Sequence, residues 1–100
     1  MSDQSPDFLA HHNGDAVAVA VRDLATGPAR GGYLDSTETE HVDLPQAVPL
    51  GHKLALRSIA KGEPVIEYGL PIGTATTDIR RGDYVHTHNL RSSRWQTSVA

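Results

Sequence analysis

The stretch "AVAVAV", residues 16–21, is the clearest structural signal in the sequence. Val17, Val19 and Val21 alternate with alanines, and this period of two places successive side chains on opposite faces of a β-strand. No polar residue interrupts the run, which indicates a strand buried on both faces. A helix is the alternative because alanine favours it, but the valines do not follow a period of 3.6 residues. We therefore predict a strand here.

Further strands are expected where apolar and β-branched residues alternate between turn residues. The segments are "HKLALR" (52–57, with Leu54 and Leu56 facing inward), "PVIEYG" (64–69) and "DYVHTH" (83–88). Residues 27–51 are rich in Gly, Pro, Thr and acids, and predict a long excursion with at most one edge strand, around Glu40–Leu44. No long window shows the periodicity of an amphipathic helix.

An internal echo links these strands. "AVRDLATG" (20–27), "ALRSIAKG" (55–62) and "TDIRRGD" (77–83) each carry a capping Asp or Ser, then an aliphatic residue, then Gly. We expect the aliphatic residue to be buried and the glycine to leave the turn at positive φ; chance similarity is the alternative. The positions are Asp23, Ser58 and Asp78, then Leu24, Ile59 and Ile79, then Gly27, Gly62 and Gly82. The predicted fold class is all-β, a meander of short strands with one-turn helical caps.

Composition narrows the class of protein. One hundred residues predict one domain at 8–90, with a flexible N-terminus at 1–7 and a polar tail at 91–100 that includes Trp95. The net charge of −3, without a basic stripe, argues against nucleic-acid binding. Without cysteine there is no disulfide, thiol nucleophile or iron–sulfur site. No signal peptide or apolar run of spanning length is recognised, so we expect no membrane association and a soluble, cytoplasmic protein.

Two segments together carry a family resemblance. "HHNGDAVAVAVRDLATG" (11–27) and "GHKLALRSIAKGEPVIEYGLPIGTATTDIRRGDYVHTHNL" (51–90) resemble the SAF domain of altronate and galactarate dehydratases, which is a β-clip. The specific pieces are "GHK" (51–53), "YGLPIG" (68–73) and "HTHN" (86–89). The chain departs from the family at Leu70, where relatives carry a polar residue. It also has "HNGDAV" in place of "HPxDNV", with His12 matching the family histidine.

The resemblance implies a small SAF subunit of a two-component lyase, inactive alone. A large dehydratase subunit would complete the active site. The reaction implied is dehydration of a sugar acid of the altronate or galactarate type to a 2-keto-3-deoxy acid, with a divalent metal, Fe²⁺ or Mn²⁺. In a related branch, the small subunit of sulfolactate sulfo-lyase, sulfite leaves instead. A non-catalytic sugar- or partner-binding module is the alternative, and homo-oligomerisation is left open.

Candidate site residues follow from the resemblance and from strand geometry. On a strand, His86 and His88 would share a face with Cα atoms about 7 Å apart, which suits a catalytic pair or two metal ligands. Without the resemblance, they would be interpreted as solvated histidines at a strand end. Lys53 suits a substrate carboxylate, although a solvated lysine is the ordinary interpretation. The expected substrate-binding residues are His52, Lys53, Asn89 and His12.

Overall fold

The computed structural model describes residues 5–92, and in this range the chain is all-β, as predicted. Its strands are β1 (Phe8–Ala10), β2 (Val17–Ala20), β3 (Gly27–Tyr33), β4 (Thr39–Leu44), β5 (Lys53–Ala55), β6 (Pro64–Glu67), β7 (Leu70–Ala75), β8 (Tyr84–Val85) and β9 (Leu90–Ser92).

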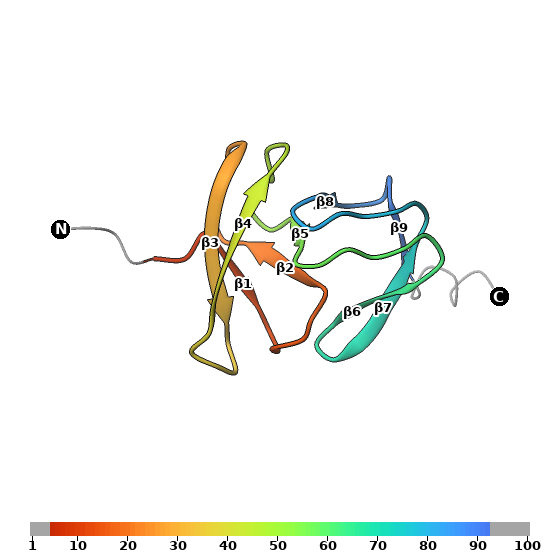
Figure 1. Cartoon of the computed structure of the whole chain (residues 1–100), viewed down its shortest axis with the longest axis horizontal. Helices are drawn as coiled ribbons and strands as arrows, with labels where there is room; N and C mark the ends of the chain where they lie inside the picture. The colour runs from red at the N-terminus through yellow and green to blue at the C-terminus, as the bar shows by residue number, and fades with distance from the viewer. Residues whose placement is uncertain (1–4, 93–100) are drawn as a thin grey trace.

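The strands form two sheets, which lie side by side in Figure 1. The six-stranded sheet has the order β4-β3-β1-β2-β5-β8, and the three-stranded sheet has the order β6-β7-β9. Neighbouring strands are antiparallel except for β1 and β3, which run parallel. Only short connections separate most strands, so the fold is a curled meander of the β-clip type.

The predicted strand at 16–21 is confirmed as β2, and it is buried on both faces. Ala18 and Ala20 belong to a core that also contains Phe8 and Leu54, while Val17 belongs to a second core beneath the three-stranded sheet. Each face of β2 thus meets a different core. This explains why the run contains no polar residue, since a polar side chain on either face would lose its water.

The echo in the sequence is confirmed as a repeated turn, but its caps are not helical. Leu24 and Val48 form an isolated antiparallel bridge with reciprocal N–H···O bonds of 2.9 Å, and Ile59 and Ile79 do the same at 2.8 Å. Their backbone groups are therefore used across the fold and are not available to a helical turn. The turn around Val48 is a copy that the sequence comparison did not detect.

The predicted burial and backbone geometry of the echo are also confirmed. Leu24, Ile59 and Ile79 are buried. The three glycines have positive φ, at 125° for Gly27, 90° for Gly62 and 94° for Gly82. The Asp side chains accept from the paired turn: Asp23 from the N–H of Leu50 and Asp78 from that of Lys61, each at 2.9 Å.

The prediction for residues 27–51 was wrong in part. An edge strand near 40–44 is present as β4, but β3 precedes it, pairs with it over its length and also pairs with β1. The glycines of β3 lower its strand propensity, so the sequence did not indicate a strand here. The packing of the sheet nevertheless requires one of these glycines. A Cβ on Gly31 would lie 2.3 Å from the Phe8 ring and its carbonyl oxygen.

Residues at both ends of the described range join the sheets. Asp7 joins the sheet region, since its N–H donates to the Arg30 carbonyl at 2.7 Å and its carboxylate accepts the Arg30 N–H at 2.8 Å. Residues 91–92 belong to β9, whereas 1–4 and 93–100, including Trp95, lie outside the described residues. Within the described range no helix is long and apolar enough to cross a membrane.

Candidate active site

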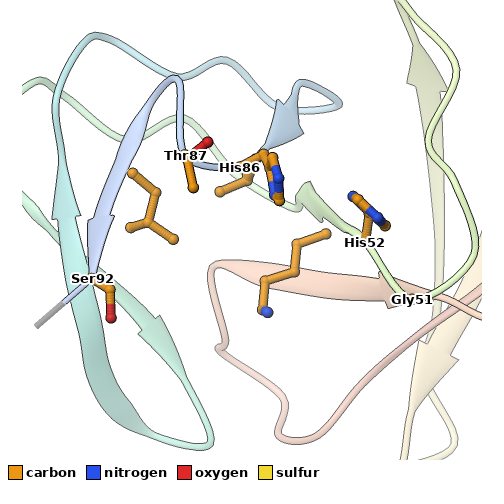
Figure 2. A pocket seen from close by; sticks show the side chains of 8 residues that line it. Gly51, His52, His86, Thr87 and Ser92 are labelled. Atoms are coloured by element: carbon orange, nitrogen blue, oxygen red, sulfur yellow. The ribbon is translucent and has the colours of Figure 1, made fainter. Parts of the chain in front are cut away.

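A cavity of about 350 Å³ opens where β5 and β8 approach β9. Figure 2 shows His52 and His86 side by side at this cavity, with Thr87 beside His86 and Ser92 across from them. The lining residues are Gly51, His52, Lys53, Val85, His86, Thr87, Leu90 and Ser92. The cavity therefore brings together His52, Lys53 and His86 from two of the segments that the sequence singled out, and His88 is not among its lining residues.

Tyr84 organises the histidines around it. The His52 Nδ1 and the Tyr84 hydroxyl share a hydrogen bond, and the His52 and His86 rings lie 5.0 Å apart between centroids. The His86 ring is nearly parallel to that of Tyr84 at 5.6 Å, and the His88 ring is tilted against it at 5.7 Å. With Nδ1 engaged, Nε2 is the His52 nitrogen that remains for another partner.

The strand expected at 83–88 ends at Val85, so the same-face strand geometry assigned to His86 and His88 was wrong. Asn89 closes the chain into a turn instead. Its Oδ1 accepts the His86 N–H at 2.9 Å, and its Nδ2 donates to the Tyr84 carbonyl at 2.8 Å. Asn89 is buried, and its amide holds the histidine turn in place. The predicted contact of Asn89 with a substrate hydroxyl stays a prediction.

The repeated turn explains why His52 is available to the cavity. Two copies of the turn carry an acid that accepts the N–H of the residue three positions earlier. The pairs are Glu63 with Ala60 at 2.8 Å and Asp83 with Arg80 at 2.9 Å. At the equivalent place His52 replaces the acid, and the residue three positions earlier is Pro49, which has no N–H to cap. The ring of His52 thus turns to Tyr84 and the cavity.

Lys53 lies between the cavity and a buried acid. Its Nζ is 3.9 Å from Oε1 of Glu67, the last residue of β6. Burial raises the pKa of the Glu67 carboxyl, against the lowering effects of Lys53 and His11 and with a further raising effect of Asp15. Lys53 is one of the residues that line the cavity, and its predicted role in binding a carboxylate stays a prediction.

The sequence profile described as the altronate/galactarate dehydratase SAF domain matches residues 6–93. The chain belongs to this SAF domain family. The resemblance stated from the sequence is therefore confirmed, and the curled all-β fold agrees with it.

Curated relatives of this SAF domain are lyases of two kinds. This chain is 40% identical over 93 residues to the alpha subunit of (2R)-sulfolactate sulfo-lyase from Chromohalobacter salexigens. The match covers 91% of this chain and 99% of that subunit. The chain is 48% identical over 86 residues to altronate dehydratase from Escherichia coli, and 35% identical over 86 residues to the Bacillus subtilis enzyme. Those matches cover 86% of this chain but 16% of each dehydratase.

His12 of this SAF domain is not among the residues that line the cavity. Its Nδ1 is 3.1 Å from Asp35 Oδ2, and the N–H of the next residue, Asn13, donates to Asp35 Oδ1 at 2.9 Å. These contacts, led by the Asn13 N–H, lower the pKa of the Asp35 carboxyl. His12 thus joins the loop before β2 to the β3–β4 connection. Its predicted contact with substrate stays a prediction.

The metal binding expected of His86 and His88 stays a prediction. In the range 5–92 there is no group of three or more His, Asp or Glu side chains placed to hold a metal ion. His52 and His86 could offer two imidazoles, but structural and catalytic zinc-type sites take at least three protein ligands. A metal shared with a partner would need further ligands from that partner.

Sequence reasoning missed two residues of the site, Tyr84 and Glu67. Tyr84 lay within the strand predicted at 83–88, but no local pattern indicated that its hydroxyl would reach His52 from a different segment of the chain. Glu67 follows Val65 by two positions, so an acid occupies the buried face of an otherwise apolar strand. A charged residue at a buried strand position was the available signal.

Proposed function

We propose that this SAF domain is the small subunit of a two-component lyase that eliminates water from a sugar acid of the altronate or galactarate type, giving a 2-keto-3-deoxy acid. The observation that carries the proposal is the cavity that places His52, Lys53 and His86 together in a member of a dehydratase family. A large subunit completes the active site.

The chemistry of elimination matches the groups in the cavity. Loss of water from a 2-hydroxy acid needs a base for the proton α to the carboxylate and an acid for the departing hydroxide. Lys53 supplies a cation for the substrate carboxylate. His86 is exposed at the cavity and serves as the proton-transfer group, while His52, oriented by Tyr84, binds a substrate hydroxyl through Nε2.

A partner is part of the proposal because the cavity, at about 350 Å³, is at the small end of the range for ligand pockets. Several large apolar side chains also lie on the surface. Leu50, 60% exposed, immediately precedes the cavity residues Gly51 and His52. The name of one relative, subunit alpha, likewise refers to an enzyme of more than one kind of chain.

A second candidate is elimination of sulfite from sulfolactate. It is favoured by the match to the sulfo-lyase alpha subunit, which this chain covers almost from end to end. The carboxylate-binding and proton-transfer roles are the same in both reactions, and only the leaving group differs. By resemblance, a divalent ion, Fe²⁺ or Mn²⁺, would stabilise the enediolate when bound, with its ligands mainly on the large subunit.

The test is co-expression with a large dehydratase-type or sulfo-lyase-type subunit, followed by a screen of altronate, galactarate and (2R)-sulfolactate. Release of a 2-keto-3-deoxy acid supports the main proposal, and release of sulfite supports the second candidate. Binding of a sugar acid by the chain without turnover in any combination would instead indicate a non-catalytic binding module.

A further inference from the structure

Glu67 is a buried carboxyl that the proposed elimination does not use. It ends β6 and pairs with Leu70 across a two-residue turn, Tyr68–Gly69. The residue is 5% exposed, although carboxylates are rarely buried without a strong partner. The hairpin fixes the backbone position of Glu67 at the end of β6.

The turn beside Glu67 is held by a different acid. Asp15 accepts the N–H of Tyr68 at 3.0 Å and of Gly69 at 3.1 Å, and also that of His12 at 3.2 Å. Asp15 thus uses both oxygens on backbone donors. Its carboxylate places a second negative charge near Glu67.

The neighbours that lower the pKa of Glu67 are Lys53 and His11. His11 stacks on the Tyr68 ring with centroids 3.7 Å apart. Lys53 lies within ion-pair distance of Glu67, but the 3.9 Å between Lys53 Nζ and Glu67 Oε1 exceeds hydrogen-bond distance. A lysine ammonium on a flexible four-carbon stem can be drawn to a second anion, and Lys53 is one of the residues that line the cavity.

We propose that a substrate carboxylate entering the cavity draws the Lys53 ammonium away from Glu67, and that Glu67 then takes up one proton from solvent. The inference rests on the proposed function, because it takes the ligand to be a hydroxy-acid carboxylate. The balance is simple: a solvent proton binds the Glu67 carboxylate, and no covalent bond of the ligand changes.

The physical reason is the cost of an unpaired buried charge. Burial already raises the pKa of Glu67, and Lys53 is the first of the neighbours that oppose this effect. When the ammonium engages the ligand, its lowering effect weakens and the pKa of Glu67 rises further. His11 and Asp15, both in the β1–β2 connection, are the other titratable groups that act on Glu67. The other titratable side chains on the cavity side of Lys53 are those of His52 and His86, which line the cavity.

The experiment follows the Glu67 side-chain carboxyl of the chain by NMR during a pH titration, with and without saturating D-altronate. We expect the ligand to raise the pKa of Glu67 by roughly one unit. D-altritol, which has the hydroxyls but no carboxylate, should leave it unchanged. In Lys53→Met the pKa should already be raised in the free chain, and D-altronate should add nothing. Lys61→Met, at an exposed lysine in the β5–β6 connection, is the matched control.

Failure of this proposal and of the proposed function give different results. A Glu67 pKa that D-altronate and (2R)-sulfolactate both leave unchanged, or that Lys53→Met does not raise, overturns the proton coupling even if the assembled enzyme is an active lyase. A ligand-dependent rise in a chain that supports no elimination with any large subunit supports the coupling and overturns the lyase assignment.

Discussion

Two histidines separated by one residue have different surroundings in this domain. His86 lines the cavity and lies 5.0 Å from the ring of His52, whereas His88 contacts Tyr84 and does not line the cavity. The turn closed by Asn89 produces this difference, because it ends the strand before either histidine.

His86→Ala should therefore lower kcat of the assembled enzyme by about 100-fold or more, because proton transfer is lost. His88→Ala is the matched control and should lower kcat by less than about threefold. Steady-state rates with saturating substrate check both variants. Equal losses of kcat in the two variants would contradict the assignment of proton transfer to His86.

Asp15 is the residue on which the β6–β7 hairpin depends. Asp15→Asn replaces one carboxylate oxygen by an amide group that faces backbone donors, so at least one of the three backbone N–H groups loses its acceptor. We expect the free energy of unfolding to fall by about 3 kcal/mol in urea denaturation. Asp43→Asn, at an exposed position of β4, should change it by less than about 0.5 kcal/mol. A neutral Asp15→Asn would contradict this account.

Glu67 should make the domain less stable as pH rises. Its pKa is raised in the fold, so the unfolded chain, with an ordinary glutamate pKa of about 4.3, loses the proton first. The stability contributed by protonated Glu67 is present in full below the unfolded-state pKa and is lost as the pH rises through the folded-state pKa. Glu67→Gln should remove this fall, measured as thermal midpoints from pH 4 to 8. Parallel curves for the two proteins would argue against it.

At the level of elements, the repeated turn is the unit from which the site is built. The copies ending in Glu63 and Asp83 use their acids to cap backbone N–H groups. The copy ending in His52 has Pro49 where the other copies have a donor. This copy has a histidine at the cavity in place of the cap, and the surrounding bridge between Leu24 and Val48 holds its backbone.

The double substitution Pro49→Ala with His52→Glu should restore the cap of the other copies. We expect the free energy of unfolding to rise by about 1 kcal/mol, measured by urea denaturation, and activity of the assembled enzyme to fall by at least tenfold. His52→Glu alone is the control: it removes the histidine but has no N–H to cap, so it should not stabilise. A stabilised single variant would show that the missing donor is irrelevant.

At the level of the whole molecule, the proposed lyase depends on a surface next to the cavity. Leu50 is exposed immediately before the lining residue Gly51, so we expect a large subunit that completes the cavity to cover it. Leu34, exposed to a similar degree, lies in the β3–β4 connection, away from the lining residues.

Leu50→Asp should weaken association with the large subunit by at least about tenfold, because a buried apolar contact becomes an unpaired charge. Leu34→Asp should leave the affinity unchanged. The measurement is the dissociation constant by interferometry, with circular dichroism to show that both variants fold. Equal affinities for the two variants would place the interface elsewhere.

Much of the all-β fold was readable from the sequence, because alternation in 16–21 and the repeated Asp/Ser–aliphatic–Gly turns are local signals. The strand β3 was not, since its glycines lower strand propensity while the close approach of Phe8 requires one of them. Local patterns report what a segment favours, and they do not report what packs against it.

The sequence by itself determined the family, the buried strand β2 and the set of histidines from which the site is drawn. Only the tertiary structure decided which of them meet: His52 with His86 at the cavity, His88 against Tyr84, and His12 with Asp35. It also placed Glu67 beside Lys53 from another sheet. The physical reason is that such pairs join residues far apart in the chain, and their approach depends on bridges and turns that no single segment specifies.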